Sequence, residues 1–123
     1  MITSEILKAR TKKFALDVIS SIEELPYKTS TKVIKNQLIR SATSVGANYR
    51  SSCRAKSRAD FIFKIKIVEE EADECCYWLE LLKDLNAIDT ETYEKLHNES
   101  DELTAIFTAI SKTSKSKIVN QKS

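Results

Sequence analysis

Residues 61–82 of the 123-residue chain read FIFKIKIVEEEADECCYWLELL. Apolar side chains recur in this stretch at alternating spacings of four and three residues, namely Phe61, Ile65, Val68, Ala72, Cys75, Leu79 and Leu82. Such a heptad pattern is typical of an α-helix that packs against other helices along one seam. The pattern therefore predicts a helix over residues 58–85, about 40 Å long at a rise of about 1.5 Å per residue.

Three further amphipathic segments accompany this one. Their apolar spacing predicts helices over residues 4–24, from about residue 30 to about residue 56, and from residue 89 or 90 to residue 111. Their seams consist, in chain order, of Leu7, Phe14, Val18, Ile22, Leu25, Ile34, Leu38, Ala42, Val45, Tyr49, Tyr93, Leu96, Ser100, Leu103, Phe107 and Ile110. Because the connections are short, we predict an all-α, up-down-up-down four-helix bundle over residues 1–111.

Polar side chains stand where these helices are expected to begin. Ser57 precedes the third helix, and its oxygen can accept a backbone N–H bond as an N-cap. Thr29 or Ser30 is expected to cap the second helix in the same way, and Asp89 or Thr90 the fourth.

The apolar periodicity fades after residue 111. Residues 112–123 hold four lysines and many Ser and Thr residues, a composition that cannot bury much apolar surface. We predict that they form a basic tail, frayed or disordered.

The composition fits one helical domain. Hydrophobic residues make up 41% of the chain and charged residues 31%, with one Gly and one Pro. A disordered chain is less apolar, and a protein of many short strands needs more turn formers. The three cysteines lack a C-x-x-C spacing, and no segment resembles a signal sequence or a membrane span. We therefore expect a cytoplasmic protein in a reducing compartment, with no cofactor and no membrane partner.

The charges are distributed unevenly along the chain. Residues 1–68 hold 14 Lys or Arg against 5 Asp or Glu, whereas residues 69–123 hold 6 against 13. This asymmetry suits an anionic partner on the basic half, and it equally suits pairing between oppositely charged helices within or between subunits. Both interpretations are open at this point.

A basic cluster surrounds the predicted turn between the second and third helices. Its candidate nucleic-acid-binding residues are Arg50, Arg54, Lys56, Arg58 and Lys64. Lys and Arg at such spacing suit contact with phosphates, while base recognition would also need exposed aromatic or amide groups. Such groups exist at Asn48 and Tyr49, although Tyr49 lies on an apolar stripe and Asn48 can instead bond at a helix interface.

Basic residues of the first helix can widen this surface. They are Lys8, Arg10, Lys12 and Lys13.

Apolar and small residues outside the main seams indicate self-association. Trp78 lies off the heptad seam, and a monomeric bundle would expose part of such a second apolar face. Gly46 lies in the small-residue run 41–47, which lets another helix come close or, alternatively, tolerates a kink. We predict that Gly46, Asn48 and Trp78 belong to an oligomer interface.

Catalytic and metal chemistry have little support. Glu94 and His97 form one Glu-x-x-His pair, but a di-iron bundle needs two and the chain has one histidine. With one glycine there is no Gly-rich phosphate loop. We expect no enzyme activity and no metal site.

Long stretches of the second and third helices carry a family resemblance. They read QLIRSATSVGANYR at residues 37–50, RAKS at 54–57, IVEEEADE at 67–74 and YWLELL at 77–82. In these stretches the chain resembles the bacterial 23S rRNA intervening-sequence proteins. Ser51 and Ser52 stand where that pattern has Glu followed by Ala, so no acidic role is inferred there.

The resemblance implies a cytoplasmic four-helix bundle that assembles as a ring-shaped homo-oligomer, a pentamer. It also implies kinship with the accessory protein of diversity-generating retroelements, which works with a reverse transcriptase and RNA. Our first hypothesis is therefore a non-catalytic RNA- or nucleic-acid-binding accessory homo-oligomer. The alternative is a self-assembling scaffold or protein-interaction module with no nucleic-acid partner.

Overall fold

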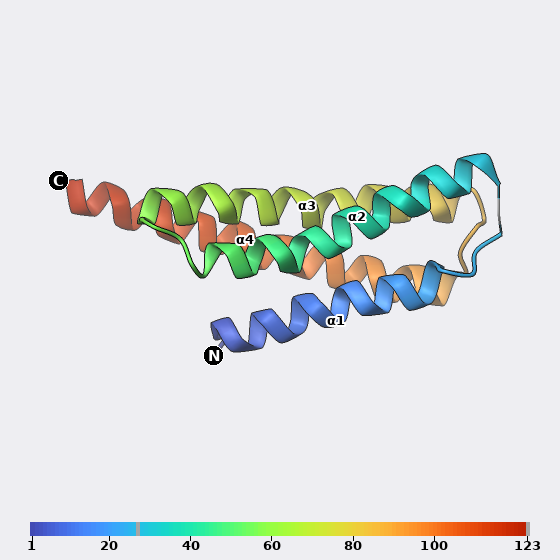
Figure 1. Cartoon of the computed structure of the whole chain (residues 1–123), viewed down its shortest axis with the longest axis horizontal. Helices are drawn as coiled ribbons and strands as arrows, with labels where there is room; N and C mark the ends of the chain where they lie inside the picture. The colour runs from blue at the N-terminus through green and yellow to red at the C-terminus, as the bar shows by residue number, and fades with distance from the viewer. Residues whose placement is uncertain (27, 123) are drawn as a thin grey trace.

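Four α-helices make up most of the chain that the computed structural model describes, residues 1–26 and 28–122, with side chains described as far as residue 116. They are α1 (Ser4–Ile22), α2 (Thr29–Ser52), α3 (Arg58–Asp84) and α4 (Thr90–Lys122). Consecutive helices run in opposite directions and lie side by side (Figure 1). The predicted all-α bundle is confirmed, and the described residues contain no strand.

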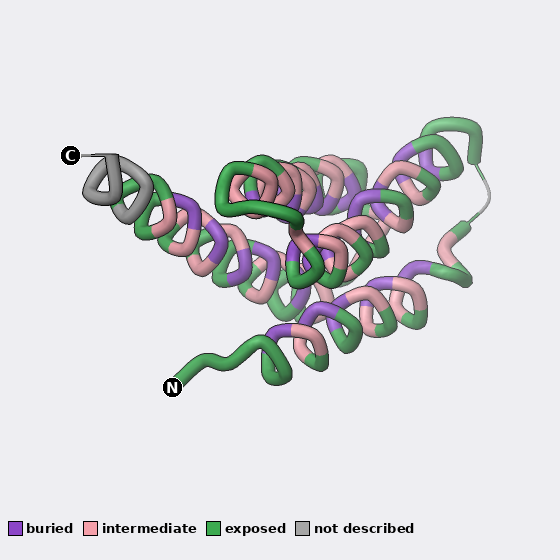
Figure 2. Tube along the Cα trace, turned by 60° about the vertical axis from the view of Figure 1, so that its left-hand side comes forward, coloured by how far each residue is buried: buried purple, intermediate pink, exposed green. Residues whose placement is uncertain are grey.

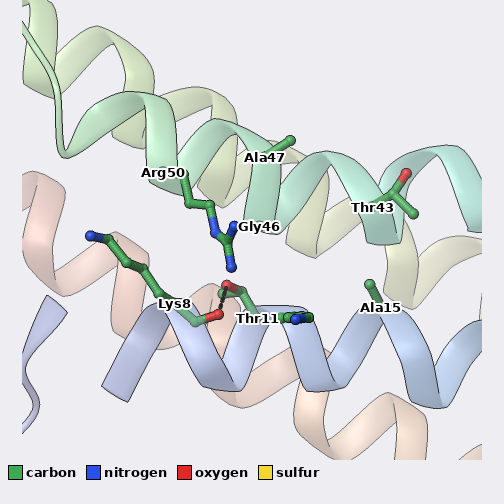
Figure 3. A pocket seen from close by; sticks show the side chains of 8 residues that line it. Lys8, Thr11, Ala15, Thr43, Gly46, Ala47 and Arg50 are labelled. Carbon is green, nitrogen blue, oxygen red and sulfur yellow. Dashed lines mark hydrogen bonds between the residues drawn. The ribbon is translucent and has the colours of Figure 1, made fainter. Parts of the chain in front are cut away.

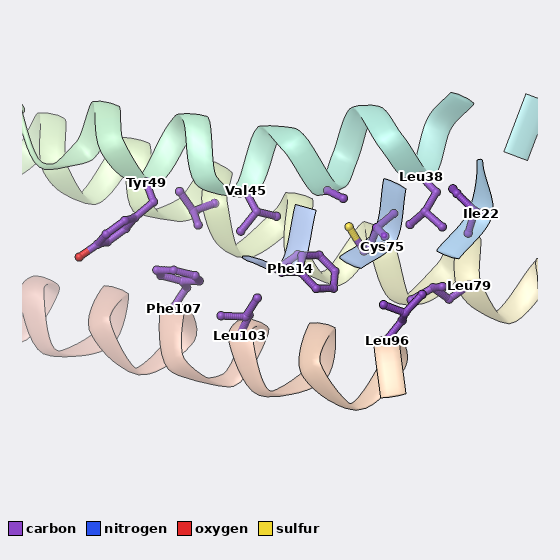
Figure 4. Packing of buried hydrophobic residues seen from close by; sticks show 14 of the residues in the cluster. Phe14, Ile22, Leu38, Val45, Tyr49, Cys75, Leu79, Leu96, Leu103 and Phe107 are labelled. Atoms are coloured by element: carbon purple, nitrogen blue, oxygen red, sulfur yellow. The ribbon is translucent and has the colours of Figure 1, made fainter. Parts of the chain in front are cut away.

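The predicted seams form the core. Nearly all of their residues are buried, and the large side chains of Phe14, Leu38, Leu79, Leu103 and Phe107 are at most 1% exposed. These side chains point from the four helices into the space between them (Figure 4). The buried stripe of each helix faces the bundle interior, and exposed residues cover the outside (Figure 2). Burial of these stripes is the main source of stability for helices of this length.

Side-chain caps start three of the helices. Ser57 accepts a hydrogen bond from the Asp60 N–H at 3.1 Å, and Asp89 accepts one from the Thr92 N–H at 2.8 Å, as predicted. Thr3 caps α1 in the same way. The prediction that Thr29 or Ser30 caps α2 is wrong, because α2 already begins at Thr29 and its N-cap, Lys28, makes no side-chain cap bond.

The end of α2 differs from the prediction. The helix ends at Ser52, about one turn before residue 56. The Lys56 N–H binds the Asp60 carboxylate at 3.1 Å instead of a helical carbonyl, so the chain turns here and enters α3. At the other end of α3, Asn86 takes a left-handed backbone conformation with φ 56°, which lets the N–H groups of Asn86 and Ala87 bond back to the helix.

Helix α4 continues past the predicted boundary at residue 111 as far as Lys122. The predicted separate tail over residues 112–123 stays a prediction, and residue 123 lies outside the described residues. No described helix is long and apolar enough to cross a membrane.

Helix α1 is the least embedded element. It packs against α2 and, less extensively, against α4. Arg10 joins it to α4 through two hydrogen bonds to the Glu99 carboxylate, at 2.8 and 2.6 Å, and Glu102 lies 3.4 Å away. The candidate site lies between α1 and α2.

Candidate nucleic-acid interface

The predicted basic cluster lies at one end of the bundle, on α2, α3 and the turn between them. Arg50, Arg54, Lys56 and Arg58 are all exposed, and none forms an ion pair with a side chain in the described part of the chain. Lys64 differs from them: it is half-buried, and its Nζ lies 3.3 Å from a carboxylate oxygen of Asp60. Four of the five predicted cations are therefore available to an external anion.

The acidic run of α3 pairs with a different arginine. Arg40 of α2 binds Glu74 at 2.6 Å and Glu71 at 3.3 Å. Pairing between oppositely charged helices is one of the two interpretations that the charge asymmetry leaves open, and within one chain the basic cluster does not pair with these carboxylates. In the described part of the chain, Lys64 is thus the one member of the cluster with a side-chain ion pair.

The basic residues of α1 divide into two pairs. Arg10 forms an ion pair with Glu99 of α4, and Lys13 forms one with Asp17 of its own helix at 2.7 Å. Lys8 and Lys12 instead border a groove between α1 and α2. Lys8 also lies 3.4 Å from the exposed Glu5, an ion pair that contributes little at such a surface position.

This groove has a volume of about 360 Å³ and continues into a smaller hollow of about 200 Å³ at the end of α2. We call the two together the basic groove. It is lined by Lys8, Thr11, Lys12, Ala15, Thr43, Gly46, Ala47, Arg50, Cys53 and Arg54. Figure 3 shows the Arg50 side chain reaching from α2 into the space above α1.

Helical spacing explains how the cations of α1 line one wall of the groove. Lys8 and Lys12 are four residues apart on α1, whereas on the other wall Arg50 lies in the last turn of α2 and Arg54 in the turn that follows Ser52. Residues at this spacing lie on the same side of a helix, about 6 Å apart along its axis. The α1 wall thus presents two positive charges one helical turn apart, and the other wall presents one from α2 and one from the turn after it.

Small side chains form the floor of the groove. A Cβ at Gly46 would lie 3.3 Å from Thr11 Oγ1, so the glycine lets α1 and α2 approach closely here. This contact accounts for a glycine that costs about 1 kcal/mol relative to Ala inside a helix. Sequence reasoning missed Thr11 and Thr43 as lining residues, although Thr43, Ala47 and Arg50 share a helical face at spacings of four and three residues.

The groups proposed for base recognition are engaged elsewhere. Tyr49 is buried and packs against Phe107, with ring centroids 5.4 Å apart, and burial raises the pKa of its hydroxyl. The Asn48 amide donates a hydrogen bond to the Ser44 carbonyl of its own helix at 2.8 Å. Both side chains therefore have roles within the chain.

The residues predicted for an oligomer interface lie apart from one another. Gly46 faces α1, Asn48 is half-buried on α2, and Trp78 is half-buried on α3. The indole N–H of Trp78 donates to Glu74 at 3.1 Å, and the exposed Tyr77 ring lies 5.0 Å from the indole. Their part in an interface between subunits stays a prediction.

The remaining reactive side chains do not gather into a site. His97 Nε2 lies 3.2 Å from a Glu80 oxygen, and no group of three or more His, Cys, Asp or Glu within the described ranges is arranged to hold a metal ion. Cys75 and Cys76 are buried, which raises the pKa of both thiols, whereas Cys53 is exposed.

Comparisons with known proteins point in one direction. The family described as 23S rRNA-intervening sequence protein matches residues 5–109. A crystal structure of a protein of unknown function from the S23 ribosomal protein family of Bacteroides thetaiotaomicron is similar to this chain, with a TM-score of 0.82 and 37% sequence identity. The similarity covers 90% of this chain and 99% of that one. Curated protein sequences contain no significant match.

Proposed function

Because the chain belongs to the 23S rRNA-intervening sequence protein family, we propose that it is a non-catalytic accessory protein that binds RNA through the basic groove. The family name connects its members with ribosomal RNA. The proposal takes the phosphate backbone as the primary ligand and a closed homo-oligomer, larger than a dimer, as the acting form.

The observation that carries this proposal is the convergence of four cations on one groove, from α1, from the last turn of α2 and from the turn after it. Arg50 of α2 and Arg54 of the turn that follows it lie across the groove from Lys8 and Lys12 of α1. Lys8 pairs with the exposed Glu5, whereas the other three form no side-chain ion pair in the described part of the chain, and the neighbouring Arg10 is held by Glu99. A cation without an intramolecular partner keeps its full attraction for an external phosphate. Each phosphate that it neutralises releases condensed counterions, which is the main source of affinity for nucleic acids.

Self-association is supported by apolar side chains that the bundle leaves in solvent. They include Leu16, Val33, Phe63, Tyr77 and Leu85, each more than half exposed. Apolar surface of this kind is often covered by another subunit. An oligomer would also repeat the basic groove, so that weak sites act together at a high effective concentration.

Charge reversal tests the proposal. We expect structured RNA to bind the wild-type protein with an affinity that falls steeply with salt. The triple variant Arg50→Glu, Arg54→Glu and Arg58→Glu is expected to abolish binding in an electrophoretic or fluorescence assay. Helicity and oligomer size are expected to stay unchanged, since all three residues are exposed and outside the core.

A matched control carries the same change of charge at the opposite end of the bundle. Lys28→Glu, Lys83→Glu and Lys95→Glu alter three exposed lysines near the start of α2, the end of α3 and the start of α4. This control is expected to weaken binding far less than the arginine triple variant. Equal losses in the two triple variants would show that only net charge matters and would contradict a groove site.

The scaffold function is the second candidate, and the exposed apolar side chains are the observation that favours it. If the arginine triple variant dissolves the oligomer, these arginines are interface residues and the scaffold function is supported instead. Light scattering at micromolar protein concentration measures the assembly directly. A monodisperse species of 14.0 kDa would contradict both the oligomer and the scaffold.

A further inference from the structure

Helices α1 and α3 each carry a second stripe of residues outside the core seam. The α1 outer stripe consists of Ile6, Ala9, Lys13, Leu16 and Ser20, and the α3 outer stripe consists of Phe63, Ile67, Glu70, Glu74, Tyr77 and Leu81. Both follow alternating spacings of three and four residues, which let one helix pack along another. All members of the α1 outer stripe are exposed, and those of the α3 outer stripe are exposed or half-buried. Each helix thus offers a second packing face to solvent.

Charged side chains occupy the middle of each stripe, between apolar ones. On α1 the charge is that of Lys13, whose bond to Asp17 is an exposed pair within one helix and contributes little. On α3 the charges are those of Glu70 and Glu74. Glu74 is held by Arg40, whereas Glu70 forms no ion pair in the part of the chain that the structure describes. The centre of one stripe is therefore positive and the centre of the other negative.

These charges decide which stripes can pair. Two copies of the α1 outer stripe, or two copies of the α3 outer stripe, would bring like charges together at the centre of the contact, which is unfavourable. Pairing of the two different stripes brings opposite charges together. With the helices antiparallel, Lys13 lies opposite Glu70, and with the helices parallel it lies opposite Glu74. In both directions the same spacing places Ile6 and Leu16 opposite apolar residues of α3, Ile67 and Tyr77.

The two stripes lie on opposite sides of the bundle. Within the described ranges, α1 and α3 both pack against α2 and α4 but not against each other, and Figure 1 shows them along opposite sides. A copy that binds a neighbour through its α1 outer stripe therefore presents its α3 outer stripe on the far side. A two-fold pair cannot satisfy both stripes, so the contact is heterologous and repeats from head to tail.

Building on the proposed function, which takes a closed homo-oligomer as the acting form, we propose that the α1 outer stripe of one copy packs on the α3 outer stripe of the next. Lys13 then meets the central glutamates of α3. Such a head-to-tail contact generates a ring when its rotation closes. It also sets the basic half of one chain against the acidic half of its neighbour, which is the pairing between subunits that the charge asymmetry allows.

Two single variants block one stripe each. Leu16→Glu adds a negative charge to the stripe that meets glutamates, and Tyr77→Lys adds a positive charge to the stripe that meets Lys13. Each variant alone is expected to lose the oligomer and to sediment as a 14.0 kDa monomer. Both side chains are more than half exposed in the single chain, so wild-type helicity is expected by circular dichroism.

A mixture of the two variants tests the head-to-tail arrangement. The Tyr77→Lys chain keeps its α1 outer stripe and the Leu16→Glu chain keeps its α3 outer stripe, so the two can pair once and cannot add a third copy. We expect a one-to-one species of twice the protomer mass. Sedimentation velocity over a series of protein concentrations measures it, because one contact is weaker alone than in a closed ring.

Asn98 of α4 supplies matched controls, because it is exposed and lies outside both stripes. Asn98→Glu and Asn98→Lys are expected to keep the wild-type oligomer. Loss of the oligomer in these controls would show a general effect of charge and would overturn the proposed interface.

The remaining results separate this inference from the proposed function. A wild-type oligomer that persists in both Leu16→Glu and Tyr77→Lys would overturn the interface while leaving the oligomer in place. Absence of the one-to-one species from the mixture would overturn head-to-tail pairing. A monomeric wild-type protein would contradict both this interface and the proposed acting form, while RNA binding is tested separately by the arginine triple variant.

Discussion

A methyl group added at Gly46 would lie 3.3 Å from Thr11 Oγ1, tighter than an ordinary carbon–oxygen contact. Thr11 is fully buried, and its hydroxyl donates to the Leu7 carbonyl at 2.8 Å. It cannot turn away without breaking that bond, which is worth about 1 kcal/mol. We therefore expect α1 and α2 to separate slightly in Gly46→Ala, at a cost of about 1–3 kcal/mol that is typical of overpacking.

A gain in helix propensity partly offsets the cost of this steric contact. Alanine is favoured over glycine inside a helix by about 1 kcal/mol. In the wild-type background we expect Gly46→Ala to lower the free energy of unfolding by about 1 kcal/mol. In a Thr11→Ala background the contacting oxygen is absent, so the same change at Gly46 is expected to raise the free energy of unfolding by up to about 1 kcal/mol.

Urea denaturation of the four proteins, followed by circular dichroism at one protomer concentration, measures this coupling. The expected interaction energy is about 2 kcal/mol, within the range for residues in direct contact. If Gly46→Ala instead stabilises the wild-type protein by its full helix propensity, the two helices are not in close contact at this point. The proposed shape of the groove would then be wrong as well.

Three further predictions concern other parts of the bundle. Arg10→Met removes the paired hydrogen bonds to Glu99 and is expected to lower the free energy of unfolding by about 1 kcal/mol, with faster amide hydrogen exchange in α1 than in α3. The backbone N–H bond to its carboxylate lowers the pKa of Asp89, so its contribution to stability is present above the unfolded-state pKa and is lost as the pH falls through the lower folded-state value. Asp89→Asn is therefore expected to flatten the loss of stability below about pH 4 in acid denaturation curves. A thiol reagent is expected to modify Cys53 rapidly in the native protein, and the two buried cysteines only after denaturant is added.

The fold could be predicted in detail because burial in a helical bundle is periodic. The heptad of α3 contains Ile65, Val68 and Leu79, which are fully buried. Most seam residues of the other three helices are buried as well. The N-caps at Ser57 and Asp89 could be predicted for a similar reason, since a cap depends on residues within one turn. The end of α2 could not, because it depends on the Asp60 carboxylate binding the Lys56 N–H in the turn that follows.

The candidate site could be predicted only in part. Exposure of Arg50 follows from its position beside the apolar stripe of α2, whereas Arg54 is exposed in the turn after the helix. Whether a cation is free or paired depends on which helices are neighbours, and Arg10 meets Glu99 across 89 positions of sequence. The groove itself depends on the register of α1 against α2, which brings Thr11 opposite Gly46 and which no local pattern specifies.

The salt dependence of RNA binding by a single groove variant tests the central claim most directly. The logarithm of the binding constant is expected to fall linearly with the logarithm of salt concentration, with a slope set by the number of neutralised phosphates. For Arg50→Gln we expect a salt-dependence slope that is smaller in magnitude by about 0.7–0.9 per groove, which is the contribution of one phosphate contact. For the control variant Lys28→Gln we expect the wild-type slope. A slope that is the same in Arg50→Gln and the wild-type protein would contradict a phosphate contact in the groove.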